Sequence, residues 1–231
     1  MRRLALALAL LACAPASWAE ADPSSVACHA FTPDAEYVDT TVIRQLEGGE
    51  ITLRVPRHYF EDAWDQAGGS RDTAQLFVVE IGSFEPVTRR EESERNRQGI
   101  WNWMHFIVGD NVPLDEIALI QARLRLPDPE LSSYPRLPGP RDLMRIESAR
   151  PDLPRPELDL DVYLFEPSAG AVQAVLACDK PGTKPFPGCK HFFRAGGLDV
   201  SISYRRTELP RWHEFQAQVT AFLTCAASDP A

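Results

Sequence analysis

The sequence predicts an α+β fold in which antiparallel β-strands pack against a C-terminal helix, as one domain or as two similar subdomains. Three observations lead to this fold class. Two strand-like segments at 158–165 and 171–178, joined by a short turn, predict a hairpin. Residues 198–206 alternate apolar and polar side chains, as in a strand with one buried face. After Pro210, which suits a first helical turn, bulky residues recur at helical spacing: Trp212, Phe215, Val219, Phe222 and Leu223. We expect this helix to lie on the apolar face of the sheet.

The N-terminal half is predicted to begin with two strands around Gly48–Gly49. In the second of them Ile51, Leu53 and Val55 alternate with polar residues, which is typical of a half-buried strand. A short turn or helix at 58–64 follows, and its aromatic side chains are expected to cap the core.

Two further segments, 75–84 and 100–109, carry apolar side chains on both faces. This pattern predicts strands that are buried from both sides, with 75–84 central in its sheet. Between them, 89–98 has no apolar residue and is predicted to be a solvated loop or an exposed helix. The pattern at 114–126 fits both a helix and a strand.

One clear shift in composition divides the chain. Eight of the 20 prolines lie between Pro127 and Pro156, which predicts a long irregular connection without regular strand pairing. The expected organisation is therefore a β-rich N-terminal subdomain at 20–126, a proline-rich connection at 127–156, and a hairpin-and-helix subdomain at 157–231. The two subdomains can also form a single domain.

The N-terminus has the features of a secretory signal peptide. Residues 1–19 contain two arginines, a short apolar run and small residues around Trp18, as before a peptidase cleavage site after Ala19. The alternative is a lipobox at residues 10–13, which would leave a lipid anchor on Cys13. Leu11, two places before the cysteine, fits that pattern poorly, so cleavage after Ala19 is preferred. The chain is expected to be periplasmic or secreted, with an envelope lipoprotein as the alternative.

The charge of the chain disfavours one class of partner. Removal of residues 1–19 removes two arginines and no acidic residue, so the formal net charge of −9 becomes −11. An acidic surface repels phosphate, which argues against nucleic acid as a partner. No apolar segment after the signal peptide approaches the roughly 20 residues of a transmembrane helix.

Four cysteines remain in the exported chain, and an oxidising compartment favours two disulfides with three possible pairings. Cys178 and Cys189 are the preferred pair because the prolines and glycines between them turn the chain back. Cys28 and Cys225 follow as the remaining pair. The spacing does not match a zinc knuckle, and no C-x-x-C redox motif occurs.

The loop between Cys178 and Cys189 carries an unusual charge. Lys180, Lys184 and Lys190 are the three lysines of the whole chain, and all lie in or beside this loop. Lysine is well hydrated, so an exposed loop tolerates it without any function. A rigid cationic loop held by a disulfide would also suit an acidic partner, and these lysines are the candidate partner-binding residues.

A search for catalytic chemistry finds few candidates. The chain has no G-x-S-x-G elbow, no H-E-x-x-H zinc motif and no phosphate loop, and neither a cofactor nor a metal is predicted. Asp159 and Asp161 share one face of a predicted strand and could act as paired carboxylates. Their alternation with leucines and valine favours a solvated strand face instead. His105 lies in a strand predicted to be buried, which favours a core histidine over a catalytic base.

Three segments together support a resemblance: ITLRVPRHYFEDAW (51–64), LFVVEIGSFEPVT (76–88) and CKHFFRAGGLDVSISYRRTELPRWHEFQ (189–216). In their order and texture they resemble uncharacterised exported proteins of proteobacteria, some of which are periplasmic immunity partners of toxins delivered between bacteria. The resemblance implies a non-enzymatic exported protein that binds and neutralises a protein partner, and it transfers no functional residue. The alternatives are an envelope hydrolase that uses Asp159, Asp161 or His105, and a structural envelope protein or lipoprotein.

Overall fold

The structure, a computed structural model, describes residues 22–122, 130–147, 160–168 and 171–227. Its helices are α1 (Pro23–Ala27), α2 (Ala63–Gln66), α3 (Arg89–Arg97), α4 (Leu114–Ala122) and α5 (Trp212–Ala227), with 3₁₀ turns at Arg57–Tyr59, Leu131–Ser133 and Arg206–Arg211. Its strands are β1 (Tyr37–Ile43), β2 (Glu50–Pro56), β3 (Ser70–Asp72), β4 (Ala74–Glu80), β5 (Trp103–Gly109), β6 (Arg136–Pro138), β7 (Met144–Ile146), β8 (Leu160–Phe165), β9 (Ala174–Asp179), β10 (Gly188–Ala195) and β11 (Leu198–Arg205).

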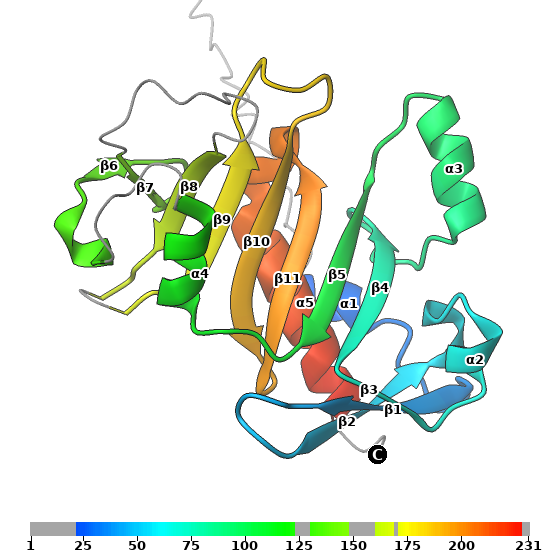
Figure 1. Cartoon of the computed structure of the whole chain (residues 1–231). Coiled ribbons are helices and arrows are strands. Elements are labelled where there is room, and N and C mark those ends of the chain that lie inside the picture. The colour runs from blue at the N-terminus through cyan, green and yellow to red at the C-terminus, as the bar shows by residue number, and fades with distance from the viewer. Residues whose placement is uncertain (1–21, 123–129, 148–159, 169–170, 228–231) are drawn as a thin grey trace, which may run out of the picture.

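The centre of the fold is an eight-stranded antiparallel sheet with the order β4-β5-β11-β10-β9-β8-β7-β6 (Figure 1). The predicted hairpin is confirmed, because β8 and β9 pair antiparallel over their whole length. The sheet unites strands from both halves of the chain, since β5 pairs with β11 through the partners Ile107 and Ser201. The predicted α+β class is confirmed.

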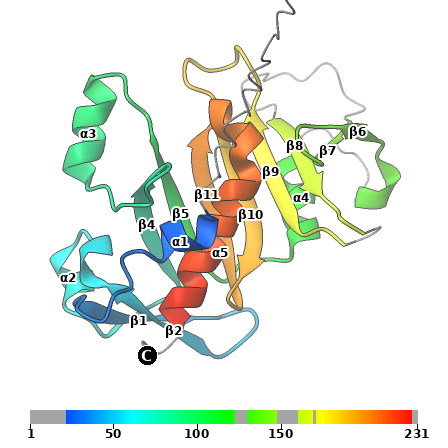
Figure 2. The same ribbon diagram turned by 180° about the vertical axis from the view of Figure 1, so that it is seen from behind.

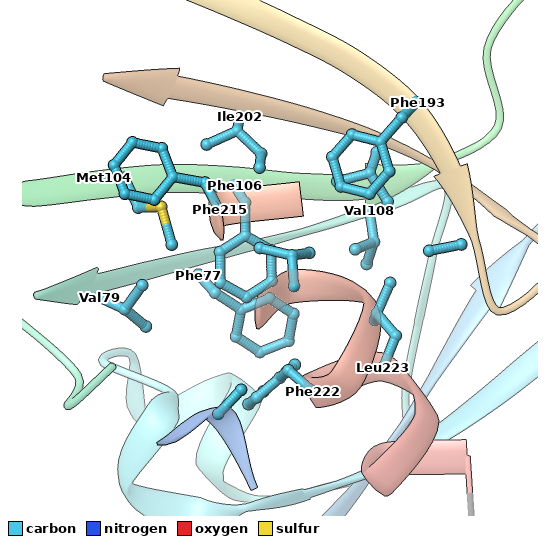
Figure 3. Packing of buried hydrophobic residues seen from close by; sticks show 14 of the residues in the cluster. Phe77, Val79, Met104, Phe106, Val108, Phe193, Ile202, Phe215, Phe222 and Leu223 are labelled. Atoms are coloured by element: carbon cyan, nitrogen blue, oxygen red, sulfur yellow. The ribbon is translucent and has the colours of Figure 1, made fainter. Parts of the chain in front are cut away.

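Helix α5 lies along one face of this sheet, as expected (Figure 2). The five apolar residues predicted at helical spacing are all buried. The ring centroid of Phe222 lies 5.4–5.5 Å from those of Phe77, Phe84 and Phe106 and 5.1 Å from that of Tyr59. Figure 3 shows Phe222 packed with Phe77 and Phe106. Burial of these rings contributes to the hydrophobic stabilisation of the fold.

The opposite face of the sheet is covered only in part. Helix α4 packs on β8, β9 and β10 through Ile117, Ala118 and Ala122. Of the two structures that the pattern at 114–126 allowed, residues 114–122 adopt the helix. Residues 123–126 lie outside the described residues. Several outward side chains of β4, β5 and β11 remain accessible to solvent, and Leu76 and Ile107 are 45% and 42% exposed.

The prediction that 75–84 and 100–109 are buried from both sides was therefore wrong. Strand β4 is an edge strand rather than a central one, and Ile107 on the outward face of β5 is exposed among the described residues. The segment 89–98 forms the exposed helix α3, which begins with a capping box between Thr88 and Glu91.

A second, three-stranded sheet has the order β2-β1-β3 and lies near the C-terminal end of α5 (Figures 1 and 2). Strands β1 and β2 form the hairpin expected around Gly48–Gly49, while β3 pairs parallel to β1. Both glycines have positive φ, near 80°, which non-glycine side chains disfavour.

The proline-rich segment is more regular than expected. Strands β6 and β7 form an antiparallel pair that extends the large sheet beyond β8, so the prediction of no regular pairing at 127–156 was wrong within the described residues 130–147. Pro138 ends β6 at the edge of the sheet, where a residue without an N–H group costs no ladder hydrogen bond.

Both disulfides are formed. Cys28, directly after α1, is bonded to Cys225 in α5 across 197 residues of sequence. Cys178 and Cys189 stand opposite each other in the β9–β10 pair, with 4.0 Å between their Cα atoms. The second disulfide therefore closes the base of a loop at 180–187, and the residues after Cys189 form a strand that the sequence pattern did not reveal.

Candidate functional site

The disulfide loop is held in place by one carboxylate. Asp179 Oδ1 accepts a hydrogen bond from Lys184 Nζ at 2.6 Å, and its Oδ2 accepts one from the backbone N–H of Gly188 at 3.0 Å. The Arg206 guanidinium donates to the Asp179 carbonyl at 2.5 Å. These bonds join both ends of the loop to the sheet, so the loop is an ordered element.

The three lysines do not form one cluster of equivalent charges. Lys184 is paired with Asp179, whereas Lys190 lies on the outward face of β10 and is exposed. Both line a hollow of about 420 Å³, and Lys180 lies at the start of the loop. The other residues that line the hollow come from α4, β8, β9, β10 and β11: Gln121, Leu160, Ala177, Asp179, Gly188, Cys189, Ser203 and Tyr204.

The open face of the sheet continues from this hollow. Cross-strand partners form a row across four strands, in the order Val78, His105, Ser203 and Lys190. A second row contains Leu76, Ile107, Ser201 and Phe192. Because side chains alternate along a strand, both rows point to the side opposite α5. We call this surface, on β4, β5, β11 and β10 between α3 and α4 (Figure 1), the open face.

His105 lies on the open face rather than in the core. Its side chain is 36% exposed, and its Nε2 lies 3.3 Å from Glu92 Oε1 on α3. The expectation of a core histidine was therefore wrong at this position. The cross-strand partner Ser203 makes no hydrogen bond with His105 in the described part of the chain, so this row does not contain an activated serine.

An aromatic and cationic cluster borders the open face and was missed by sequence reasoning. The guanidinium carbon of Arg205 lies 4.1 Å from the ring centroid of Trp101 and 4.6 Å from that of Phe186. Phe186 belongs to the disulfide loop and is 58% exposed. Trp101 is oriented by a hydrogen bond from its Nε1 to Asn96 of α3 at 2.6 Å. The alternation in 198–206 places Arg205 outward, but nothing in it indicates the two rings.

Asp161 corrects another expectation. It is buried rather than solvated, with a side chain that lies 2.6 Å from Arg206 and 3.5 Å from Arg145. Arg206 also donates to the Tyr163 hydroxyl at 3.3 Å. Burial, more than the neighbouring Asp161, raises the pKa of Tyr163. Asp161 is thus a buried ion-pair partner, and Asp159 lies outside the described residues.

The buried histidine of the core is His191. It is fully buried on the α5 side of β10, among the rings of Phe193, Tyr204 and Trp212. The Nε2–H group of the neutral ring donates to Gln216 Oε1 at 3.1 Å. Burial lowers the pKa of His191 from 6.5 to about 3. The ring is therefore uncharged at neutral pH.

Two further findings concern the described residues as a whole. They contain no group of three or more His, Cys, Asp and Glu side chains placed to hold a metal ion. None of their helices combines the length and the apolar character that a membrane crossing requires.

Two solved structures share this fold. One is Smlt3025, an immunity protein of the type IV secretion system of Stenotrophomonas maltophilia, with a TM-score of 0.59 and 16% sequence identity over 85% of this chain and 94% of that chain. The other is FrpD, an iron-regulated outer membrane lipoprotein of Neisseria meningitidis, with a TM-score of 0.50 and 12% identity over 84% of this chain and 93% of that chain. At these identities the likeness shows the fold alone. No family model and no curated protein matches the sequence.

Proposed function

We propose that this chain is an exported binding protein that neutralises a protein partner, as an immunity protein does. The observation that carries the proposal is the likeness of the fold, over 85% of the chain, to an immunity protein of a bacterial secretion system. The resemblance of the three sequence segments to exported proteins, some of them immunity proteins, points to the same kind of function.

The chemistry of the surface supports a binding role. Trp and Arg side chains are enriched at the energetic centres of protein interfaces, and Trp101, Phe186 and Arg205 form one such group beside exposed apolar side chains of the open face. Two disulfides are typical of proteins outside the cytoplasm. We propose a periplasmic location after cleavage at Ala19, with a lipid anchor at Cys13 as the alternative.

The alternative of an envelope hydrolase receives less support from the geometry. The Asp161 carboxylate forms ion pairs with Arg206 and Arg145. His105 Nε2 contacts the Glu92 carboxylate. The Asp161 carboxylate is therefore engaged in ion pairs, and within the described residues His105 has no hydrogen bond to a hydroxyl nucleophile.

The test is growth competition between the source strain and a mutant that lacks this gene. The mutant is expected to be killed when mixed with its parent, and expression of the exported protein in the mutant is expected to restore survival. A version without residues 1–19 serves as the control and should not protect. Equal survival of the mutant and the parent would refute the proposal.

A further inference from the structure

Arg205 is a cation that packs against two aromatic rings. Its guanidinium lies against both Trp101 and Phe186, and the two rings also contact each other with their centroids 4.9 Å apart. In the part of the chain that the structure describes, the Arg205 side chain makes no hydrogen bond and no ion pair. The Arg205 side chain is half-buried, and this burial lowers its pKa. An ion pair formed there would be stronger than one at a fully exposed position.

Lys190 is a second available cation next to Arg205. In the β10–β11 register, Gly188 stands opposite Arg205 and Lys190 stands opposite Ser203. Lys190 and Arg205 are therefore diagonal neighbours on the same side of the sheet, about 7–8 Å apart at their Cα atoms. Lys190 also makes no ion pair with the described residues.

Three carboxylates around this surface have basic partners within the chain. Asp179 is paired with Lys184 at 2.6 Å, Glu80 with Arg95 at 3.0 Å, and Glu92 with His105 at 3.3 Å. Arg205 and Lys190 thus form a local site of positive charge on a chain whose net charge is −9. Such a site attracts an anionic group from outside the molecule.

The surroundings indicate which kind of anion fits. A planar guanidinium binds a carboxylate through two parallel hydrogen bonds. Phe186 offers an exposed ring beside the cation, and Ile107 and Leu76 extend the apolar surface across the open face. This combination suits the side chain of an aspartate or glutamate that protrudes from a folded partner and is flanked by apolar residues.

We propose that Arg205 and Lys190 form a carboxylate-binding site, bordered by Phe186 and Trp101, which receives an acidic side chain of the neutralised partner protein. The proposal rests on the proposed immunity function and names the surface through which it acts. The sequence suggested Lys180, Lys184 and Lys190 as the partner-binding residues. The proposed site keeps Lys190 and adds Arg205 on the neighbouring strand.

The test uses protection of the gene-deleted strain as the readout. Arg205→Gln and Lys190→Gln are expected to lower survival about tenfold or more relative to the wild-type protein, because each leaves the partner carboxylate with an unsatisfied interaction. Phe186→Ala is expected to act in the same direction. Arg205→Lys keeps the charge without the planar fork, so it should protect less well than the wild type.

Matched controls lie outside the open face, in β2 and α2. Arg54 stacks over the Tyr37 ring at 5.2 Å in the small sheet, so Arg54→Gln removes a comparable stacked cation. Trp64 is 88% exposed on α2, so Trp64→Ala matches the loss of an exposed ring at Phe186. Both variants should protect fully. Exported amount and urea unfolding midpoint are measured for every variant, so that only folded proteins are compared.

The outcomes separate the two proposals. If the wild-type protein protects and Arg205→Gln, Lys190→Gln and Phe186→Ala protect equally well while folded, the carboxylate site is refuted and the immunity function stands. If deletion of the gene does not make the strain sensitive to its parent, the proposed immunity function is refuted. The carboxylate-binding site, which rests on that function, is then refuted as well. If sedimentation shows a wild-type dimer that Arg205→Gln converts to a monomer, the site binds a second copy, which also refutes the inference.

Discussion

The buried neutral His191 predicts a specific loss of stability in acid. The ring is fully buried and its pKa is about 3, against 6.5 for an ordinary histidine. Below pH 6.5 the unfolded chain binds a proton at this position and the folded chain does not. The unfolded state therefore gains free energy as the pH falls, and the stability contributed by the neutral ring is lost between pH 6.5 and pH 3.

The magnitude follows from the separation of the two pKa values. A pH of 4 lies 2.5 units below the pKa of 6.5 that the ring has in the unfolded chain, whereas the folded ring is still mostly neutral at this pH. At about 1.4 kcal/mol per unit, His191 alone should remove about 3 kcal/mol of unfolding free energy between pH 7 and pH 4. Burial is the largest cause of the lowered pKa; the hydrogen bond to Gln216 opposes it, and the smaller influence of His213 acts in the same direction as burial.

The assay is urea unfolding, followed by tryptophan fluorescence with the disulfides intact, at pH 7 and pH 4. His191→Gln keeps an N–H donor for Gln216 and cannot titrate, so its stability should fall by about 3 kcal/mol less than that of the wild type over this interval. The exposed His58 provides the control, since His58→Gln should retain the wild-type pH dependence. An unchanged pH dependence in His191→Gln would refute the reasoning.

Three other predictions concern the framework and the N-terminus. Replacement of Cys28 and Cys225 by alanine should cost about 5 kcal/mol, against about 3 kcal/mol for Cys178 and Cys189, because the first disulfide closes a far longer loop; equal losses in chemical denaturation would contradict this order. Phe222→Ala should cost about 3–5 kcal/mol, because the ring fills the centre of the aromatic core; the exposed Thr220→Ala is the control, and a loss below about 1 kcal/mol for Phe222→Ala would contradict the packing. Intact mass of the exported protein should correspond to a chain that begins at Glu20; a lipid-modified Cys13 would exclude that cleavage.

The comparison of the two histidines shows where sequence reasoning fails. Both His105 and His191 lie in strands with apolar neighbours, and the pattern favoured His105 as the buried one. In the structure α5 covers the side of the sheet that His191 faces, whereas His105 faces the open side. The decisive difference is the helix on one face, which no short window of sequence describes.

The carboxylate-binding site shows the same limit. Alternation in the last strand places Arg205 on the side opposite the apolar residues, so its outward direction could be predicted. Trp101 lies more than 100 residues earlier in the chain, and Phe186 lies in a loop whose prolines gave no indication of a contact. A stacked guanidinium therefore arises only when three distant segments meet.

Local sequence determined the features that depend on neighbouring residues. The period of apolar side chains determined the hairpin β8–β9, the strand β11 and the helix α5, and the count and spacing of cysteines indicated the two disulfides. Tertiary structure alone decided that β4 is an edge, that Asp161 is buried against Arg206, and that one face of the sheet stays open. The physical reason is that burial depends on which element packs against a face, and that element comes from elsewhere in the chain.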